Sequence, residues 1–229
     1  AGFGKTGNQA IGSYIPLIRL VPGGHFYYNG EFRRSYGPGS NPNPNLKWET
    51  KYEYDIGIDW ETLNGRLSGS LDLYTRRTED LLHNYDVPVP PNLYSTTFAN
   101  VGTMENQGIE FSFNTVPVKQ QNLQWNLNFN FSYRTQELVS LSNENYKLEW
   151  HNAGWIDPGI GLSTWTHRYG EGMELGNFHG HVFKGISDEG DWILKDLDKD
   201  GDIDKNDRKI IGNGLPDYYA NLNTSITYK

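Results

Sequence analysis

The sequence predicts an all-β fold: part of an antiparallel transmembrane β-barrel with long extracellular loops and an EF-hand-like calcium loop. Three observations support this. Apolar and polar residues alternate over several stretches of about 11 residues, which at ~3.3 Å per residue can cross a bilayer core as tilted strands. The polar positions are rich in Asn, Gln, Asp and Glu, as expected for a water-filled lumen. Short turns also alternate with long connections along the chain, which is typical of outer-membrane barrels.

Composition excludes several classes of protein. The 229 residues carry a formal net charge of -8, which argues against a nucleic-acid partner because no basic stripe could displace counterions from phosphates. Cysteine is absent, so the chain has no disulfides, thiolate metal sites or cysteine nucleophile. The sequence contains no run of about 18 apolar residues, so it predicts no transmembrane helix. Aromatic residues make up 14 % of the chain, which suits strands with one apolar face.

The clearest strand pair surrounds the dipeptide Asn64-Gly65. Residues 50–61 alternate strictly and predict a strand whose apolar side carries Tyr52, Tyr54, Ile56, Ile58 and Trp60. Asn-Gly favours a type I′ turn, because both central residues of that turn have positive φ. Residues 67–74 alternate again and predict the returning strand of a hairpin.

A second pair and a fifth strand follow the same pattern. Residues 109–114 predict one strand, residues 117–122 a turn, and residues 123–134 a long returning strand. The apolar side of this long strand carries Leu123, Trp125, Leu127, Phe129, Phe131 and Tyr133. Residues 218–228 predict the fifth strand.

Connection length distinguishes the two ends of this predicted sheet. The turns at 64–65 and 117–122 are short, whereas the connections 78–106 and 135–217 are long and rich in Gly, Pro, Trp, His and Tyr. Because antiparallel strands alternate in direction, the short turns lie at one end and the long loops at the other. Short periplasmic turns and large extracellular loops have this asymmetry. The insert 135–217 is therefore expected on the outer face.

The main alternative is a secreted, calcium-dependent, carbohydrate-binding β-sandwich, whose strands also alternate but more often have five or six residues. An all-β glycoside hydrolase is a third possibility, but no sequence spacing identifies an acid/base pair, a nucleophile elbow or a phosphate loop. The chain is therefore predicted not to be an enzyme. Dependence on detergent would separate barrel from sandwich, since a barrel exposes its apolar faces to lipid.

Residues 196–207 have the spacing of an EF-hand calcium loop, with oxygen donors at positions 1, 3, 5, 9 and 12 and Gly201 at position 6. Calcium prefers six to eight hard oxygen ligands, and this dense acidic run would repel itself without a cation. The alternative is a solvated acidic loop. Position 12 is Asp207 rather than Glu, and the flanks predict short strands or one helical turn, which favours a structural role over a sensor. The predicted calcium ligands are Asp196, Asp198, Asp200, Asp202, Asp204 and Asp207.

Aromatic residues in the long insert predict a substrate site. Aromatic rings stack on the CH faces of sugars, so an outward loop of this composition could bind a glycan. The alternative is that the rings pack the interior of the loop itself. The predicted substrate residues are Trp150, Trp155, Trp165 and His167. A zinc pair at His179 and His181 is disfavoured, because the sequence places no third ligand near them.

Several motifs, in this order, resemble one known family. They are Gly7-Asn8-Gln9, the segments 43–49 and 64–70, the segment 101–108, Lys195-Asp196-Leu197 and Ile210-Ile211-Gly212-Asn213. Together they resemble the C-terminal barrel region of SusC-like TonB-dependent outer-membrane transporters (the RagA/SusC family).

This resemblance implies one section, residues 1–229, of a receptor barrel of roughly 22 strands, located in the outer membrane and facing its lipid. It also implies a SusD-like surface lipoprotein as partner, TonB as the energy source through an N-terminal region, and oligosaccharides or peptides as substrates. The plug domain and TonB-contact segment are expected to lie outside this chain, as are the strands that close the barrel.

Overall fold

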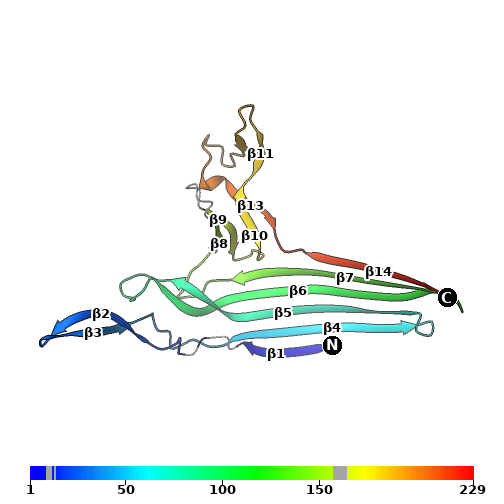
Figure 1. The fold of residues 1–229 in the computed structure, drawn as a ribbon, viewed down its shortest axis with the longest axis horizontal. Helices are drawn as coiled ribbons and strands as arrows, with labels where there is room; N and C mark the ends of the chain where they lie inside the picture. The colour runs from blue at the N-terminus through cyan, green and yellow to red at the C-terminus, as the bar shows by residue number, and fades with distance from the viewer. Residues whose placement is uncertain (9–11, 13, 157–163) are drawn as a thin grey trace.

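A computed structural model describes residues 1–8, 12, 14–156 and 164–229 (Figure 1). Apart from one 3-10 turn, all regular secondary structure in the described part is antiparallel strand, so the predicted all-β, antiparallel architecture is confirmed. None of its helices has the length and apolar character needed to span a membrane.

The main sheet contains six strands in the order β1-β4-β5-β6-β7-β14, and every neighbouring pair is antiparallel (Figure 1). Their bounds are β1 Gly2–Asn8, β4 Glu49–Thr62, β5 Leu67–Asp86, β6 Thr96–Lys119, β7 Leu123–Ser140 and β14 Tyr218–Tyr228. The five predicted strands are β4 to β7 and β14. Strand β1 was not predicted, because its three glycines leave no apolar alternation, and pairing with β4 holds it in the sheet.

Two predicted loop boundaries were wrong. Strands β5 and β6 continue past their predicted ends, so their connection is 87–95 rather than 78–106. A register shift near Asp80, which has a φ of 61°, interrupts the alternation and hid this extension. Residues 135–140 belong to β7, so the long insert runs from 141 to 217.

The two short turns lie at the opposite end of the sheet, as predicted. In the first, the Arg66 N–H donates to the Leu63 carbonyl (3.3 Å) around Asn64 and Gly65, whose φ values of 55° and 76° fit the predicted type I′ turn. The second turn is shorter than predicted, since β6 runs to Lys119 and the Gln120 N–H donates to the Leu123 carbonyl (2.8 Å).

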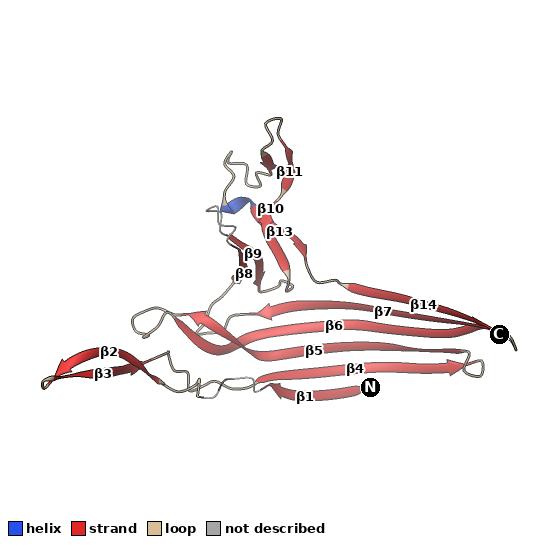
Figure 2. Cartoon of the chain, viewed as in Figure 1, coloured by secondary structure: helices blue, strands red, loops and turns tan. Residues whose placement is uncertain are grey.

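One face of the main sheet is apolar across every long strand. Its cross-strand rows include Ile56–Leu73–Ile109–Tyr133–Tyr218, Ile58–Leu71–Phe111–Phe131–Ala220 and Trp60–Gly69–Phe113–Phe129–Leu222. Ile58 and Leu222 are 64 % and 62 % exposed, and no other strand of the described residues pairs or packs over these rows (Figure 2). Such a surface needs an apolar solvent. The β-sandwich alternative is not favoured, because a sandwich would bury this face under a second sheet.

The opposite face of the sheet is polar along the same strands. Its rows include Asp59–Ser70–Ser112–Asn130–Asn221 and Glu61–Ser68–Asn114–Asn128–Asn223. Neighbouring amides hydrogen-bond one another, and Asn130 Nδ2 donates to Asn128 Oδ1 (2.8 Å). This face matches the water-facing side of a barrel wall.

Aromatic residues border the apolar face at both ends. Tyr133 and Tyr218 form a cross-strand pair toward the insert, and Tyr228 pairs with Leu123 toward the short turns. From Leu123 to Tyr133, β7 rises about 33 Å at ~3.3 Å per residue. A strand tilt of about 40° reduces this height to about 25 Å, the usual height of the apolar band in an outer-membrane barrel. The spacing of these rings therefore fits the two interfaces of a membrane.

The insert forms separate small sheets that rise beside the main sheet, above the end of β7 opposite the short turns (Figures 1 and 2). One has four strands in the order β13-β10-β9-β8, and another pairs β11 with β12. Their bounds are β8 Trp150–Ile156, β9 Thr164–Gly170, β10 Asn177–His181, β11 Phe183–Ile186, β12 Trp192–Leu194 and β13 Arg208–Asn213. A 3-10 turn, η1 Lys205–Asp207, precedes β13. A further hairpin that was not predicted pairs β2 Leu20–Tyr28 with β3 Glu31–Pro38.

A small core joins the insert to the main sheet. Its buried apolar residues are Tyr85, Ala99, Leu138 and Leu141. The Tyr85 hydroxyl donates to the Leu141 carbonyl (3.0 Å), and burial raises the pKa of Tyr85 to about 12. The backbone of Leu138 exchanges hydrogen bonds with Gly172 and Met173 (2.9 Å each). The insert is therefore attached to the end of β7 at a defined position.

We expect a charge on the apolar face to destabilise the receptor far more than the same charge on the polar face. Leu222→Arg places a guanidinium midway between Tyr218 and Tyr228 and should cost about 2–4 kcal/mol in a bilayer. Asn221→Arg, its neighbour on the polar face, should cost less than about 1 kcal/mol. Guanidinium titration of the receptor folded in lipid vesicles measures both values, and equal costs would contradict the assignment of the faces.

Candidate functional site

The acidic loop, residues 196–207, connects β12 to β13 and is held by hydrogen bonds from its own backbone. Gly201 has a φ of +97°, which permits the sharp turn that position 6 of such a loop requires. The Gly201 N–H donates to Asp196 Oδ2 (3.0 Å), and the Asp202 N–H donates to Asp200 Oδ1 (2.9 Å). The flanks are the short strands β12 and β13, in agreement with the prediction of short strands or one helical turn, and the 3-10 turn η1 lies within the loop itself.

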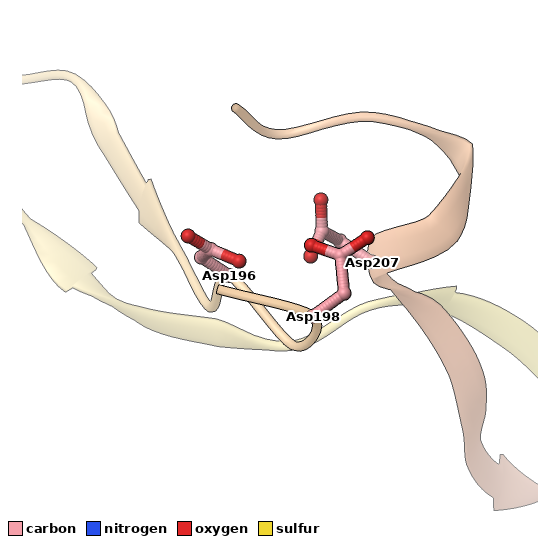
Figure 3. Close-up of side chains that lie close together, drawn as sticks. All are labelled: Asp196, Asp198 and Asp207. Carbon is pink, nitrogen blue, oxygen red and sulfur yellow. The ribbon is translucent and has the colours of Figure 1, made fainter. Parts of the chain in front are cut away.

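Three of the six predicted calcium ligands lie together. Asp196, Asp198 and Asp207 each place a carboxylate oxygen within 4.8 Å of the others, and they come from both ends of the loop (Figure 3). In the described part of the chain, no other group of three or more His, Cys, Asp or Glu side chains has this geometry.

The other three predicted ligands lie outside this cluster. Asp200 accepts the hydrogen bond from the Asp202 N–H, and the Asp204 carboxylate caps η1 by accepting from the Asn206 N–H (2.6 Å). Asp202 contributes no side-chain oxygen to the cluster. Half of the six predicted carboxylates, those of Asp196, Asp198 and Asp207, therefore surround a common centre.

Asp207 anchors the loop. It is fully buried, and its carboxylate accepts the backbone N–H of Leu197 (2.6 Å) and of Asp204 (2.8 Å). These N–H donors hold the pKa of Asp207 below its ordinary value. Partial desolvation raises the pKa of Asp198, and the negative charges of Asp200, Asp207 and Asp196 raise it further. A cation among these carboxylates would relieve that repulsion.

The four predicted substrate residues divide between two faces of the insert sheet. Trp155 pairs with Trp165 across β8 and β9, with ring centroids 5.0 Å apart, and His167 lies two residues along β9 on the same face. Trp150 lies on the opposite face, where the Arg168 guanidinium stands 4.0 Å from its ring centroid. No single pocket therefore contains all four residues.

An apolar groove of about 620 Å³ adjoins Trp165. Its other large apolar lining residues are Phe178, Phe183, Trp192, Leu194 and Ile211. These residues were not predicted as a site, because they come from separate strands, including β11 and β12, that line one groove only in the folded insert.

The disfavoured zinc pair has no third ligand in the described residues. His179 and His181 both lie on β10, and His181 Nε2 already accepts a hydrogen bond from Arg208 Nε (3.2 Å). The only three-residue group of possible metal ligands described is the aspartate cluster. A cation beside two imidazoles would also be repelled by that guanidinium.

Comparison with known proteins identifies the family. The model of the "TonB dependent receptor-like, beta-barrel" family matches residues 7–229. The chain is 33 % identical over 251 residues to TonB-dependent receptor P3 of Formosa agariphila, and the match covers 100 % of this chain and 24 % of that protein. It is 30 % identical over 236 residues to TonB-dependent receptor SusC of Bacteroides thetaiotaomicron, covering 100 % of this chain and 23 % of that relative. The chain therefore spans about a quarter of the length of these relatives.

Solved structures show the same fold. The RagAB peptide importer in its "open-open" state superposes with a TM-score of 0.77 at 22 % identity, covering 99 % of this chain and 24 % of that one. Its "closed-closed" state gives a TM-score of 0.70 at 20 % identity, with the same shares of both chains covered. The resemblance to SusC-like and RagA-like proteins is confirmed, and so are the predictions of an outer-membrane location and of a protein that is not an enzyme. The chain belongs to the TonB-dependent receptor-like β-barrel family.

Proposed function

We propose that this chain forms part of the wall of an outer-membrane importer that takes up oligosaccharides. The observation that carries the proposal is the two-sided main sheet, whose apolar rows suit lipid and whose amide-rich rows suit a lumen. Membership of the family and the 30 % identity to SusC support import as the activity. Peptides are the alternative substrate, but the RagAB structures, at 20–22 % identity, support the fold alone.

The proposed importer works with a SusD-like surface lipoprotein and is energised through TonB. The insert supports the first partnership, because it projects from the end of the sheet opposite the short turns (Figure 1). Short turns face the periplasm in outer-membrane barrels, so the insert faces outward. A partner that docks on an ordered surface at this position loses less conformational entropy on binding than one that must order a flexible loop.

Calcium in the acidic loop is the proposed source of that order. Asp196, Asp198 and Asp207 would supply the first carboxylates, and Asp200, Asp202 and Asp204 lie close enough in sequence to add oxygen ligands. Calcium suits such a set of hard oxygens, and binding would clamp β12 against η1 and β13. The short flanking elements support a structural ion rather than a signalling one.

Deleting the gene for the full receptor should abolish growth on oligosaccharides while growth on their monosaccharides continues. Small sugars cross through general porins, whereas larger ones need a dedicated importer. Uptake of labelled oligosaccharides, with complemented cells as the control, measures this. Unchanged oligosaccharide uptake, or loss of peptide uptake alone, would refute the proposed substrate class.

Removing calcium should loosen the acidic loop. With a chelator present, limited proteolysis of the receptor should cut within residues 196–207 at least about tenfold faster than with calcium, since a bound ligand stabilises the folded loop. Magnesium, which demands tighter octahedral geometry, should protect less. Equal cleavage rates with calcium and with chelator would exclude a calcium clamp.

Asp207→Ala should release the loop even at neutral pH. Without this carboxylate the N–H groups of Leu197 and Asp204 lose their acceptor, and their amide hydrogen exchange should quicken by about tenfold. Asp188→Ala is the matched control, since this exposed carboxylate lies outside the acidic loop and makes no hydrogen bond in the described part of the chain. In the wild type, protection should persist above the ordinary carboxyl pKa of about 4 and be lost as pH falls through the lowered pKa of Asp207. Identical exchange in both variants would contradict the anchoring role.

A further inference from the structure

One face of the four-stranded insert sheet gathers positive charge. Alternation along the strands places Thr164 and Arg168 of β9 on the same face as His179 and His181 of β10. Arg208 of β13 pairs across the ladder with His181. Its guanidinium donates through Nε to His181 Nε2 (3.2 Å) and through Nη1 to Thr164 Oγ1 (2.9 Å), so it reaches across β10 to β9. We call Arg168, His179, His181 and Arg208 the arginine face.

Neither arginine of this face has a carboxylate partner within 4.0 Å in the described part of the chain. Both side chains are half-buried. Arg168 donates only to the amide oxygen of Asn152 (3.1 Å) and covers the ring of Trp150. Burial and the charge of Arg208 both lower the pKa of Arg168. Two partly desolvated guanidiniums whose charges repel each other are unfavourable without a counter-charge, and an anion on this face would offset that repulsion.

The two histidines leave hydrogen-bonding capacity unused. His179 is only 9 % exposed and makes no hydrogen bond among the described residues. Burial, followed by the charges of Arg168 and Arg208, lowers its pKa, so the imidazole is neutral and offers one N–H donor. His181 accepts from Arg208 at Nε2, which places its own proton on Nδ1, and that nitrogen is buried without a partner. Buried donors without acceptors are costly, so they indicate a missing acceptor.

The nearby aspartate cluster does not supply that acceptor. Asp207 precedes Arg208 in sequence, but both of its oxygens accept backbone N–H groups within the acidic loop. Asp207 therefore bonds the loop at the end of η1, whereas Arg208, the first residue of β13, bonds His181 and Thr164 on the sheet.

We propose that the arginine face binds the carboxylate of a uronic acid unit in an imported acidic oligosaccharide. A guanidinium matches the planar carboxylate with two parallel hydrogen bonds, and the two imidazoles add donors. Trp150 is 44 % exposed although Arg168 covers one side of its ring, so the other side provides an aromatic surface for the apolar side of the sugar ring. This inference rests on the proposed import of oligosaccharides and narrows its substrate class to acidic glycans.

The test measures binding of trigalacturonate and of neutral maltotriose to the detergent-purified full-length receptor by isothermal titration calorimetry. Arg168→Gln and Arg208→Gln should each weaken trigalacturonate binding by about tenfold or more, as expected for the loss of a charge-assisted hydrogen bond. Lys209→Gln is the matched control. It removes the same charge from the next residue of β13, which is exposed and points to the other face, and it should leave binding unchanged.

Arg168→Lys keeps the charge but loses the planar fork of the guanidinium, so it should retain an intermediate affinity for trigalacturonate. Heat-modifiable migration in gels confirms that each barrel is folded.

Trigalacturonate affinities that are equal in the wild type and both glutamine variants would overturn the proposal, as would an equal loss in Lys209→Gln. If trialanyl-aspartate competed for the site as strongly as trigalacturonate, the ligand would be a peptide carboxylate rather than a uronic acid. That result would also overturn the proposal. Cells that import neutral oligosaccharides through a receptor with no affinity for trigalacturonate would refute this inference alone. Cells that import no oligosaccharide would refute the proposed function.

Discussion

The antiparallel register of the main sheet is the constraint on which the rest of the structure depends. Within a bilayer each backbone N–H and C=O must find a partner in the protein, and the paired long strands supply those partners between neighbours. The same register aligns side chains in rows, so a one-residue slip would move Ile58 and Leu222 to the lumen side and the asparagines into lipid. A single strand register therefore satisfies both the backbone hydrogen bonds and the separation of apolar from polar side chains.

Beyond the membrane rows, the same alternation organises the insert. The contacts of Tyr85 and Leu138 mark the place where the barrel wall gives way to the small sheets of the insert. In the insert, the neighbouring and oppositely charged residues Asp207 and Arg208 make hydrogen bonds in different places. Asp207 closes the acidic loop, while Arg208 extends over β10 to Thr164. The acidic loop and the arginine face therefore meet where η1 passes into β13, each with its own hydrogen-bond partners.

Much of the wall could be predicted from sequence, because two-residue periodicity survives wherever one face meets lipid. Prediction from this periodicity failed at β1, where glycines stand in place of apolar residues. It also failed beyond Asp80, where a register shift interrupts the two-residue period. The candidate sites in the insert were harder to predict from the sequence, since they depend on which face of a sheet each side chain occupies. Trp150 and Trp165 have equal chemical character but lie on opposite faces, and the spacing of the aspartates could not show that only three converge. The arginine face combines residues from three strands, so no local sequence motif indicates it.

The central claim is that the main sheet separates lipid from water, and single-cysteine scanning along β7 tests it most directly. The chain has no cysteine of its own, so each introduced thiol in this segment can carry one spin label. In the receptor folded in lipid vesicles, labels at 125, 127, 129, 131 and 133 should collide with lipid-soluble oxygen, and labels at 126, 128, 130 and 132 with a water-soluble nickel complex. This account predicts a two-residue period of opposite phase for the two reagents. Uniform accessibility, or protection of the odd positions from both reagents, would contradict it.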